Sequence, residues 1–390
     1  MNKSILIEKT KKYHSDIYDI LPDVISFAPG RIEVLGNHTD YNQGVTLSVA
    51  IDQGVCFTIS SSKKNSINVK SINFNESILL STTCNDAPSK YGWANYIRGI
   101  LYYFNKNNNI KLQGMNCTFY GSIPMGSGLS SSAALEISLL FALQKFYKTS
   151  MDLKYLAKIG QLAEQNFAGC QCGLLDQYSS IFGIKNGFIH TNFKTNEISQ
   201  IEINNDIVFL VINSNIQHEL TNSPYNNRRQ DCKNAVNELN KLLPKKINAL
   251  ADISYNEFEL NSKSLSPRSF HRAKHIIGEN DRVFKAISYL NNNELKEFGN
   301  LLYESHESSK NDFENSCKEL DQIVVSAKDC NALGARLSGG GWGGSVIVLT
   351  NKNDADDLLE KMILLIKNKN INPTGNIIYP SEGAKIIEEF

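Results

Sequence analysis

The chain has 390 residues, which is enough for two ordinary domains or one large one. Its 40 Lys and Arg residues balance its 40 Asp and Glu residues, so the formal net charge is zero and no basic bias indicates a nucleic-acid partner. Hydrophobic residues make up 41% and charged residues 21%, a composition typical of a globular protein that buries its core without disulfides or structural metal.

The first part of the chain is rich in β-branched and apolar residues bounded by Asn, Ser and Gly, which predicts strands. The predicted strands cover residues 24–27, 45–51, 55–60, 67–74, 78–81 and 115–121. Apolar residues at helical spacing predict helices over residues 93–105, 130–147, 153–168 and 174–182. We therefore expect mixed α/β structure here, with a Gly/Ser loop between the last of these strands and the second helix.

The second half of the chain changes in character. Strands are predicted over residues 187–193, 198–203 and 208–213, and helices then dominate over residues 225–243, 281–290, 295–310 and 317–329. A glycine cluster leads into a last group of elements, predicted as a strand, a helix and a strand over residues 345–350, 355–367 and 376–379. The change from strands to helices predicts a domain boundary near residue 200, dividing the chain into residues 1–200 and 201–390.

Cysteine usage and the N-terminus indicate a cellular compartment. The eight cysteines are scattered, and Cys170 and Cys172 form a lone C-x-C without a second pair, which argues against a zinc ribbon. Residues 1–20 are charged throughout and lack the apolar stretch of a signal peptide. No segment approaches the roughly 20 apolar residues of a membrane helix. We therefore expect a cytoplasmic protein with reduced cysteines and no membrane partner.

A glycine- and serine-rich run lies between a predicted strand and a predicted helix; it reads GSIPMGSGLSSSAALE from Gly121 to Glu136. Free N–H groups at a helix N-terminus bind anions, glycines allow the backbone to approach a phosphate, and hydroxyls can donate to phosphate or coordinate Mg²⁺. The run therefore predicts an ATP phosphate site. Its residues would be Gly126, Ser127, Gly128, Leu129, Ser130, Ser131, Ser132 and Ala133.

Two common phosphate-binding loops are excluded for this run. No Lys follows the glycines, so it is not a Walker A loop. The third glycine of the Rossmann fingerprint is missing, and no acidic residue stands at a strand end about 20 positions further on. A serine-capped helix after a flexible turn is the alternative for a short G-x-G. The length of the run favours the phosphate loop.

A polar burst follows the first predicted strand, where Arg31, Asn37, His38, Thr39 and Asp40 fall within ten residues. Fixed donors and acceptors at such density suit a polyol ligand, because each of its hydroxyls needs a partner. A polar surface loop would have a similar composition. The segment alone does not separate these two interpretations.

Taken together, these segments resemble the galactokinases, a family of the GHMP kinase superfamily. Residues 121–136 resemble the second motif of the superfamily, and residues 335–344 (ARLSGGGWGG) resemble its third, whose loop backs onto the phosphate loop. Residues 28–44 resemble the galactokinase signature. Further stretches of resemblance, in the family's order, cover residues 172–177, 213–229, 272–279 and 306–322.

The resemblance implies a two-domain α+β fold with mixed α/β parts. The N-terminal half would be an α/β domain of the ribosomal-protein type, the C-terminal half a ferredoxin-like α+β domain, and the active site would lie in the cleft between them. The implied activity is ATP-dependent phosphorylation of the C1 hydroxyl of D-galactose, by a monomer whose partner is a small-molecule sugar. The alternatives are a kinase of N-acetylgalactosamine, L-arabinose or galacturonate, or a sugar sensor without turnover.

The resemblance also implies roles for single residues. Asp176 would face the C1 hydroxyl as general base or orienting group, and Arg31 would lie against Asp176 and the γ-phosphate. Ser132, with Ser131 beside it, and Glu164 would hold Mg²⁺ through hard oxygens. The structural alternatives are a first-turn helix acid for Asp176, a surface ion pair for Arg31 and a solvated helix acid for Glu164.

Adenine and sugar contacts follow from the same resemblance. Trp93 and Tyr96 match aromatic positions that flank adenine in the family, although aromatic residues at helical spacing are as often part of a core. The positions that match sugar contacts are Asn37, His38, Asp40, Gly173, Asp176 and Tyr225.

One of these positions departs from the family pattern. Glu is usual where this chain has Asn37, and by resemblance that Glu reaches toward O6 of the sugar. An amide in its place removes a charge and adds donors. This predicts weaker discrimination for a free 6-hydroxyl and room for a 6-deoxy or carboxylate-bearing ring. Trp342 stands where Phe is common in the third motif, a change that we expect to be tolerated.

Overall fold

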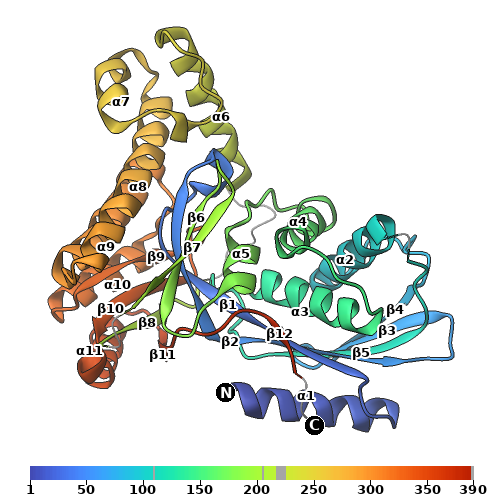
Figure 1. Ribbon diagram of the computed structural model, residues 1–390. Coiled ribbons are helices and arrows are strands. Elements are labelled where there is room, and N and C mark those ends of the chain that lie inside the picture. Colours follow the sequence, from blue (N-terminus) through green and yellow to red (C-terminus); the bar gives the residue numbers. More distant parts are fainter. Residues whose placement is uncertain (109, 204–205, 217–224, 388–390) are drawn as a thin grey trace.

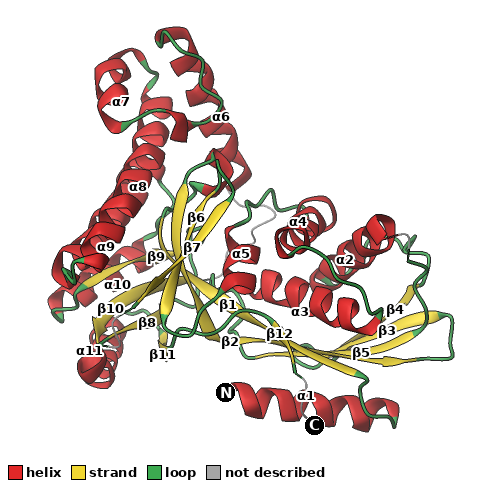
Figure 2. Cartoon of the chain, viewed as in Figure 1, coloured by secondary structure: helices red, strands yellow, loops and turns green. Residues whose placement is uncertain are grey.

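The computed structural model describes residues 1–108, 110–203, 206–216 and 225–387. Two sheets with their covering helices form the body of the molecule, and a group of helices projects from it (Figure 1). Figure 2 shows the strands in the middle of the body and helices on its outside. The mixed α+β class predicted from the sequence is confirmed.

The larger sheet is built mainly by the first half of the chain. Its order is β12-β1-β2-β5-β3-β4, with β6 added to β2 and β7 to β6, and every pair is antiparallel except β3 with β5. The strands are β1 (Val24–Leu35), β2 (Val45–Ser61), β3 (Ser66–Ser71), β4 (Glu76–Ser81), β5 (Met115–Gly121), β6 (Gly187–Asn192), β7 (Glu197–Glu202) and β12 (Lys385–Ile386).

Long strand β1 carries two irregularities in its pairing with β2. The register shifts between Pro29 and Arg31 and again between Glu33 and Leu35. Such bulges bend a strand and redirect its side chains, and they are common beside active sites. They are placed here so that Arg31 and Glu33 project into the cavity described below.

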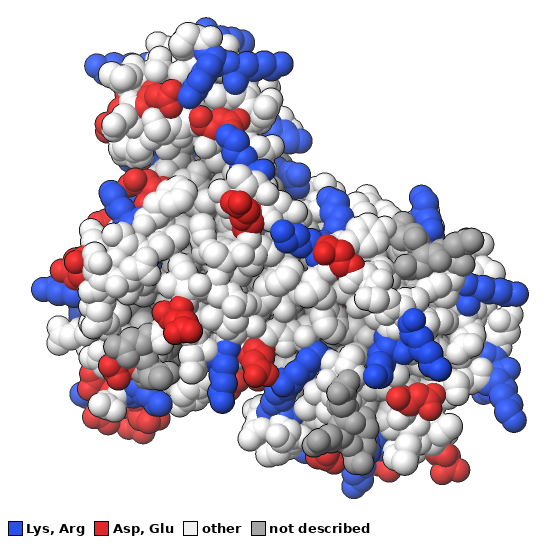
Figure 3. All heavy atoms as spheres, in the orientation of Figure 1, with Lys and Arg blue, Asp and Glu red and all other residues white. Residues whose placement is uncertain are grey.

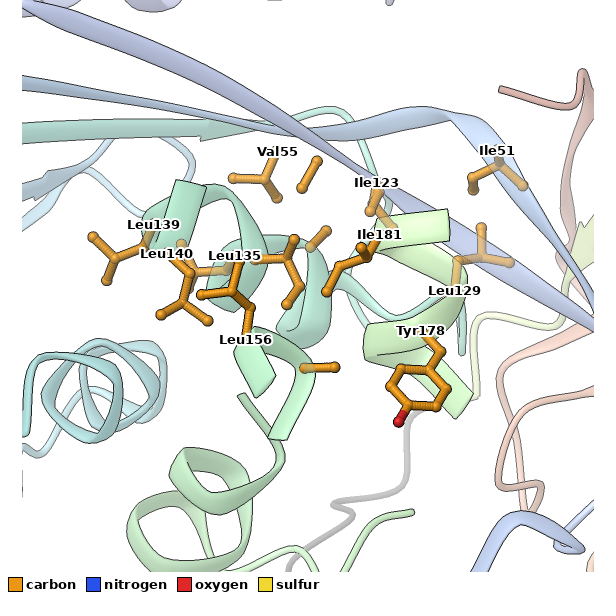
Figure 4. Packing of buried hydrophobic residues seen from close by; sticks show 14 of the residues in the cluster. Ile51, Val55, Ile123, Leu129, Leu135, Leu139, Leu140, Leu156, Tyr178 and Ile181 are labelled. Atoms are coloured by element: carbon orange, nitrogen blue, oxygen red, sulfur yellow. The ribbon is translucent and has the colours of Figure 1, made fainter. Parts of the chain in front are cut away.

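Helices cover both faces of the larger sheet. On one face lie α2 (Gly92–Asn108), α3 (Ser131–Phe146), α4 (Leu153–Ala163) and α5 (Leu175–Phe182), and α1 (Lys3–Tyr18) lies on the other (Figure 1). Helix α3 is buried along most of its length because it contacts β1, β2 and all three neighbouring helices. A helix enclosed in this way is mostly apolar around its circumference, and α3 follows this apart from a few polar residues such as the fully buried Glu136. In Figure 4 its leucines pack between Leu156 and Val55.

The smaller sheet has the order β11-β8-β10-β9, and all its pairs are antiparallel. Its strands are β8 (Ile207–Asn213), β9 (Gly334–Ser338), β10 (Ser345–Asn351) and β11 (Thr374–Ile378). Alternate residues of β8 face opposite sides: Phe209 joins the core of the larger sheet, whereas Leu210 packs with α10 (Lys318–Asp329) and α11 (Ala355–Lys367). Both faces are therefore buried, which explains the continuous apolar run of β8.

The projecting helices are α6 (Tyr225–Leu242), α7 (Tyr255–Asn261) and the first part of α8 (Pro267–Asn291), and they share a small core of their own. The last part of α8 and helix α9 (Leu295–Ser308) pack back against the body, where Val283 and Phe298 join the large core. Basic and acidic side chains are interspersed over the face shown in Figure 3, which agrees with the neutral composition.

Most predicted elements are present, and the differences have physical reasons. The strands predicted at 45–51 and 55–60 are one strand, β2, because the half-buried Asp52 and Gln53 keep the strand continuous across the irregularity in its pairing with β1 instead of forming a turn. The helix predicted at 281–290 begins at Pro267, since its first half packs on the projecting core. Elements α1, α7, β9 and β12 were not predicted. Strand β9 was hidden by the glycine cluster that follows it.

The predicted division near residue 200 stays a prediction. The first strand of the smaller sheet begins at Ile207, but β12 returns to pair with β1 of the larger sheet, and one apolar core joins residues of both halves. Among the described residues, no helix is long and apolar enough to cross a membrane.

Candidate active site

A cavity of about 240 Å³ opens where β1, α5 and two glycine-rich loops meet. Nearly all the residues singled out in the sequence line it, although they are spread over 200 positions of the chain. They are Arg31, Asn37, His38, Asp40, Tyr96, Gly126, Ser127, Gly128, Leu129, Ser130, Ser131, Ser132, Glu164, Gly173, Asp176 and Tyr225.

The predicted phosphate loop joins β5 to α3 and has an unusual backbone. Gly126, Gly128 and Ser130 all have positive φ, at 66°, 71° and 59°. This conformation favours glycine at the first two positions, and Ser130 is held in it at the N-terminus of the buried helix α3. The Ser130 hydroxyl is buried and has no hydrogen-bond partner among the residues that the structure describes. The loop rests on Leu129 and Ile123, which insert into the apolar core (Figure 4).

The second glycine loop, residues 339–344, packs against the phosphate loop. A Cβ atom on Gly339 would lie 3.0 Å from the carbonyl oxygen of Gly128, and one on Gly128 would lie 3.0 Å from that of Ser338. Trp342 within the loop has a φ of 58° and is fixed because its Nε1 donates to the carbonyl of Glu314. The two motifs are thus held together by contacts in which a side chain would not fit.

Arg31 and Asp176 form an ion pair in the floor of the cavity. Arg31 Nε and Nη2 donate to Asp176 Oδ1 at 2.9 and 2.7 Å, and Nη1 donates to the carbonyl of Gly128 at 2.6 Å. The arginine side chain is buried, whereas the carboxylate keeps 27% of its side-chain surface exposed, toward the cavity that it lines. The pair therefore joins the phosphate loop to the first turn of α5.

A second carboxylate, Asp40, lies close to this pair. Its oxygens accept hydrogen bonds from the backbone N–H groups of Tyr41 and Leu175, at 2.8 and 3.5 Å. Burial raises the pKa of Asp40 to about 6, the hydrogen bond from Tyr41 opposes this, and the charge of Asp176 adds to it. Gly173 is required here because a Cβ atom would overlap the Asp40 carboxylate.

His38 stands in an aromatic group at one end of the cavity. Its ring centroid lies 4.6 Å from that of Phe313 and 5.0 Å from that of Tyr225. The two ring nitrogens contact the hydroxyl of Tyr41 at 2.8 Å and the carbonyl of Gly340 at 3.0 Å. Burial lowers the pKa of His38 to about 3, so the ring is neutral and donates from Nε2 to the carbonyl.

Asn37 is buried, and its side-chain amide is engaged by the protein. Nδ2 donates to Glu33 Oε2 and to the carbonyl of Gly339, both at 2.9 Å, while Oδ1 accepts from Asn315 Nδ2 at 2.9 Å. Both amide protons are therefore used within the protein. The predicted effect of Asn37 on discrimination at the 6-hydroxyl stays a prediction.

Ser132 and Glu164 lie together at the phosphate end. The Ser132 hydroxyl is 3.5 Å from Glu164 Oε1, and Gln177 Nε2 donates to both Glu164 and the fully buried Glu136. Burial and, to a smaller extent, the negative charge of Asp176 raise the pKa of Glu164 to about 7. A hydroxyl and a carboxylate at this spacing suit Mg²⁺, which is usually held by one or two protein oxygens together with phosphates and waters.

Two of the predicted ATP contacts lie apart from the cavity lining. Ala133 is buried inside α3, and Trp93 packs edge-on against Phe119 while its Nε1 donates to Glu76 at 2.6 Å. The cavity also contains residues that were not predicted as site residues, among them Glu33, Cys170 and Cys172. A Glu between Ile32 and Val34 in an apolar strand was the available signal for the first of these.

Comparison with known proteins decides between the remaining interpretations. The GHMP kinases N terminal domain matches residues 95–184, GHMP kinases C terminal matches residues 286–365, and the galactokinase galactose-binding signature matches residues 12–61. A galactokinase of Clostridium acetobutylicum is 35% identical over 369 residues, covering 93% of this chain and 94% of the relative. The chain belongs to the galactokinase family.

Other members of the galactokinase family agree in length and fold. The galactokinase of Bacillus subtilis is 33% identical over 341 residues, covering 86% of this chain and 87% of its own. The structure of Lactococcus lactis galactokinase complexed with galactose has a TM-score of 0.91 at 26% identity and covers 97% of this chain and 99% of that one. The predicted GHMP kinase fold is thereby confirmed.

Proposed function

We propose that this chain transfers the γ-phosphoryl group of ATP to the C1 hydroxyl of D-galactose, giving galactose 1-phosphate. The observation that carries the proposal is the position of the Arg31–Asp176 pair. On one side of the pair lies the glycine-rich phosphate loop, and on the other lies the part of the same cavity that is lined by polar and aromatic residues. Membership of the galactokinase family and the galactose-binding signature support the choice of sugar.

Phosphoryl transfer needs positioning and charge stabilisation more than covalent help. Asp176 would accept the hydrogen bond, and then the proton, of the attacking hydroxyl, a contribution of about 10²–10⁴-fold in rate. Arg31 holds the Asp176 carboxylate from one side and contacts the phosphate loop from the other. It is therefore placed to stabilise negative charge that develops on the transferred group.

The side chains at the phosphate end include a hydroxyl and a carboxylate, which are the kinds of oxygen ligand that Mg²⁺ takes. Ser132 and Glu164 would hold it, and the ion would neutralise phosphate charge when bound. Gln177 keeps the Glu164 carboxylate oriented and lies one residue after Asp176 on α5. The same helix thus positions the proposed base and the proposed metal ligand.

At the sugar end, Asp40 and the aromatic wall of His38 and Tyr225 would contact the hydroxyls and ring face of the sugar. We further propose that the enzyme acts as a monomer in the cytoplasm. All eight cysteines are free thiols, as expected in a reducing compartment.

Removal of the Asp176 carboxylate tests the proposal. Asp176→Ala should lower galactose-dependent ADP release by about 10²–10⁴-fold, while ATP affinity measured by calorimetry stays within about threefold. Asp52→Ala, which removes a carboxylate on β2 outside the cavity lining, is the matched control and should keep full activity. Near wild-type turnover by Asp176→Ala would refute the role of this residue.

A further inference from the structure

Glu33 is a buried carboxylate in the wall of the cavity, and the function described above does not use it. It lies on β1, is 2% exposed, and follows Arg31 by two positions, so both side chains leave the strand on the same side. Its backbone is fixed by Ser338, whose hydroxyl accepts from the Glu33 N–H at 2.9 Å. A carboxyl group in this position needs an explanation, because burying an ionisable group without full compensation costs folding free energy.

Among the described residues, hydrogen bonds reach only one of its carboxylate oxygens. Oε2 accepts from Asn37 Nδ2 at 2.9 Å and from the backbone N–H of Gly339 at 3.0 Å. Oε1 accepts no hydrogen bond from any residue that the structure describes, and it is not among the enclosed atoms without a partner. One oxygen is thus anchored, and the other is left for a donor in the cavity that Glu33 lines.

Two opposing effects act on the Glu33 carboxylate. Burial raises its pKa to about 7, although the positive charges of Arg336 and then Arg31 act to lower it. No hydrogen bond joins Glu33 to either arginine among the described residues; Arg336 Nη1 donates to the carbonyl of Val34. Glu33 is therefore not the direct ion-pair partner of a structural arginine, and its bonded partners are an amide and a peptide N–H.

Asn37 determines which group faces the ligand. Its two amide protons are bound to Glu33 and to the carbonyl of Gly339, and its oxygen is bound to Asn315. The amide can offer no proton to a sugar without giving up one of these bonds. Asn37 instead orients the Glu33 carboxylate. Its bond to Oε2 fixes the carboxylate plane and so sets the direction in which Oε1 points.

We propose that Glu33 is a specificity-determining residue, whose Oε1 accepts a hydrogen bond from a sugar hydroxyl other than the C1 hydroxyl, and that Asn37 is the positioning residue for this carboxylate. The substrate class that follows is a neutral sugar, because a carboxylate on the ring at this place would meet a like charge without a donor. The proposal rests on the proposed sugar-kinase function and deepens it.

Deoxygenated sugars give the sharpest test. Steady-state kcat/KM is measured for wild type and Glu33→Gln with galactose and with its 2-, 3-, 4- and 6-deoxy derivatives. The substitution should lower kcat/KM for galactose by about 10–100-fold. For one deoxy sugar the two enzymes should agree within about threefold, because the hydroxyl that Glu33 binds is already missing. An equal loss with every sugar, or no loss with galactose, would overturn the proposal.

A reciprocal exchange separates recognition from folding. Glu33→Asn combined with Asn37→Glu keeps one carboxylate and one amide in contact. The kcat/KM of this double variant should therefore be at least about tenfold higher than that of Glu33→Asn alone. The ATP KM and the melting temperature of each variant serve as controls for the phosphate end and the fold. Failure of the exchange to restore activity in a variant that melts like wild type counts against the proposal. If wild type releases no ADP with any sugar, the proposed function itself fails.

Discussion

At the scale of single residues, the site depends on side chains that make more than one contact. Arg31 is the clearest case, since its guanidinium binds Asp176 through Nε and Nη2 and the phosphate loop through Nη1, while its backbone N–H donates to the carbonyl of Leu129. The planar guanidinium can serve these partners together, whereas an ammonium group has a different shape and a shorter reach. The charge alone therefore does not explain the choice of arginine.

Arg31→Lys should separate charge from geometry. The lysine keeps the positive charge but cannot bind Asp176 and the Gly128 carbonyl at once, so kcat should fall by about 10²-fold while the galactose KM changes by less than about fivefold. Arg268→Lys is the matched control, because the Arg268 side chain on α8 is 74% exposed, lies outside the cavity lining and should tolerate the change. A kcat for Arg31→Lys close to wild type would show that charge is sufficient.

The sequence predicts most of this site, because the glycine run and the polar burst are local patterns that folding brings together. It predicts Asn37 as a contact of the sugar but not its actual partners, since Gly339 and Asn315 lie about 300 positions away. Glu33 and Trp93 show the same limit. A Glu in an apolar strand and a Trp on an amphipathic helix do not reveal from local spacing which of them faces a cavity and which a core.

At the scale of elements, α1 shows how a helix that packs one side on a sheet can go unpredicted from its sequence. Its buried side is formed by Leu6, Ile7, Thr10 and His14, so polar residues occupy half of the apolar stripe that would identify it. His14 replaces apolar contact by hydrogen bonds to Thr58 and Ser60 of β2, at 3.0 and 2.9 Å. Because the Thr58 hydroxyl donates to the carbonyl of Thr118, His14 Nδ1 must be the donor in its bond to Thr58.

This contact predicts a pH dependence of stability. Burial lowers the pKa of His14 from 6.5 to about 4, so above pH 6.5 the ring is neutral in both the folded and unfolded states. As the pH falls from 6.5 toward 4, only the unfolded chain takes up the proton, and the free energy of unfolding decreases by about 1.4 kcal/mol per pH unit. Below about 4 both states are protonated and the dependence ends.

His14→Asn removes the titrating group and should flatten this part of the profile. Urea unfolding of wild type and variant at pH 7, 6 and 5 measures the difference in stability, which should shrink by about 2 kcal/mol between pH 7 and pH 5. Asn costs some stability at every pH, so only the change with pH is diagnostic. A constant difference across the three pH values would contradict the assignment of His14 as a neutral buried ring.

At the scale of the whole molecule, the two sheets share one apolar core. Phe298 of α9 is fully buried, and its ring centroid is 5.7 Å from that of Phe188 on β6 of the larger sheet. Phe188 also meets Phe209 of β8 at 6.2 Å, which joins the larger sheet to the smaller one. Strand β12 adds a further connection, because the last part of the chain pairs with β1. The cavity lies between parts that cannot separate without exposing this core.

The shared core predicts that the molecule unfolds in a single transition. The chain has two tryptophans, Trp93 beside the larger sheet and Trp342 in the second glycine loop, so Trp93→Phe and Trp342→Phe each leave one fluorescent reporter for one half. For each variant, fluorescence and circular dichroism should give the same denaturant midpoint, even where the substitution itself changes the stability.

Phe298→Ala, which should cost about 3–5 kcal/mol, tests the connection itself: it should lower the midpoints reported by both tryptophans together. Met362→Ala, in the separate core under α11, is the matched cavity control. Midpoints that diverge in Phe298→Ala but not in Met362→Ala would show that this aromatic contact holds together two units that otherwise unfold independently.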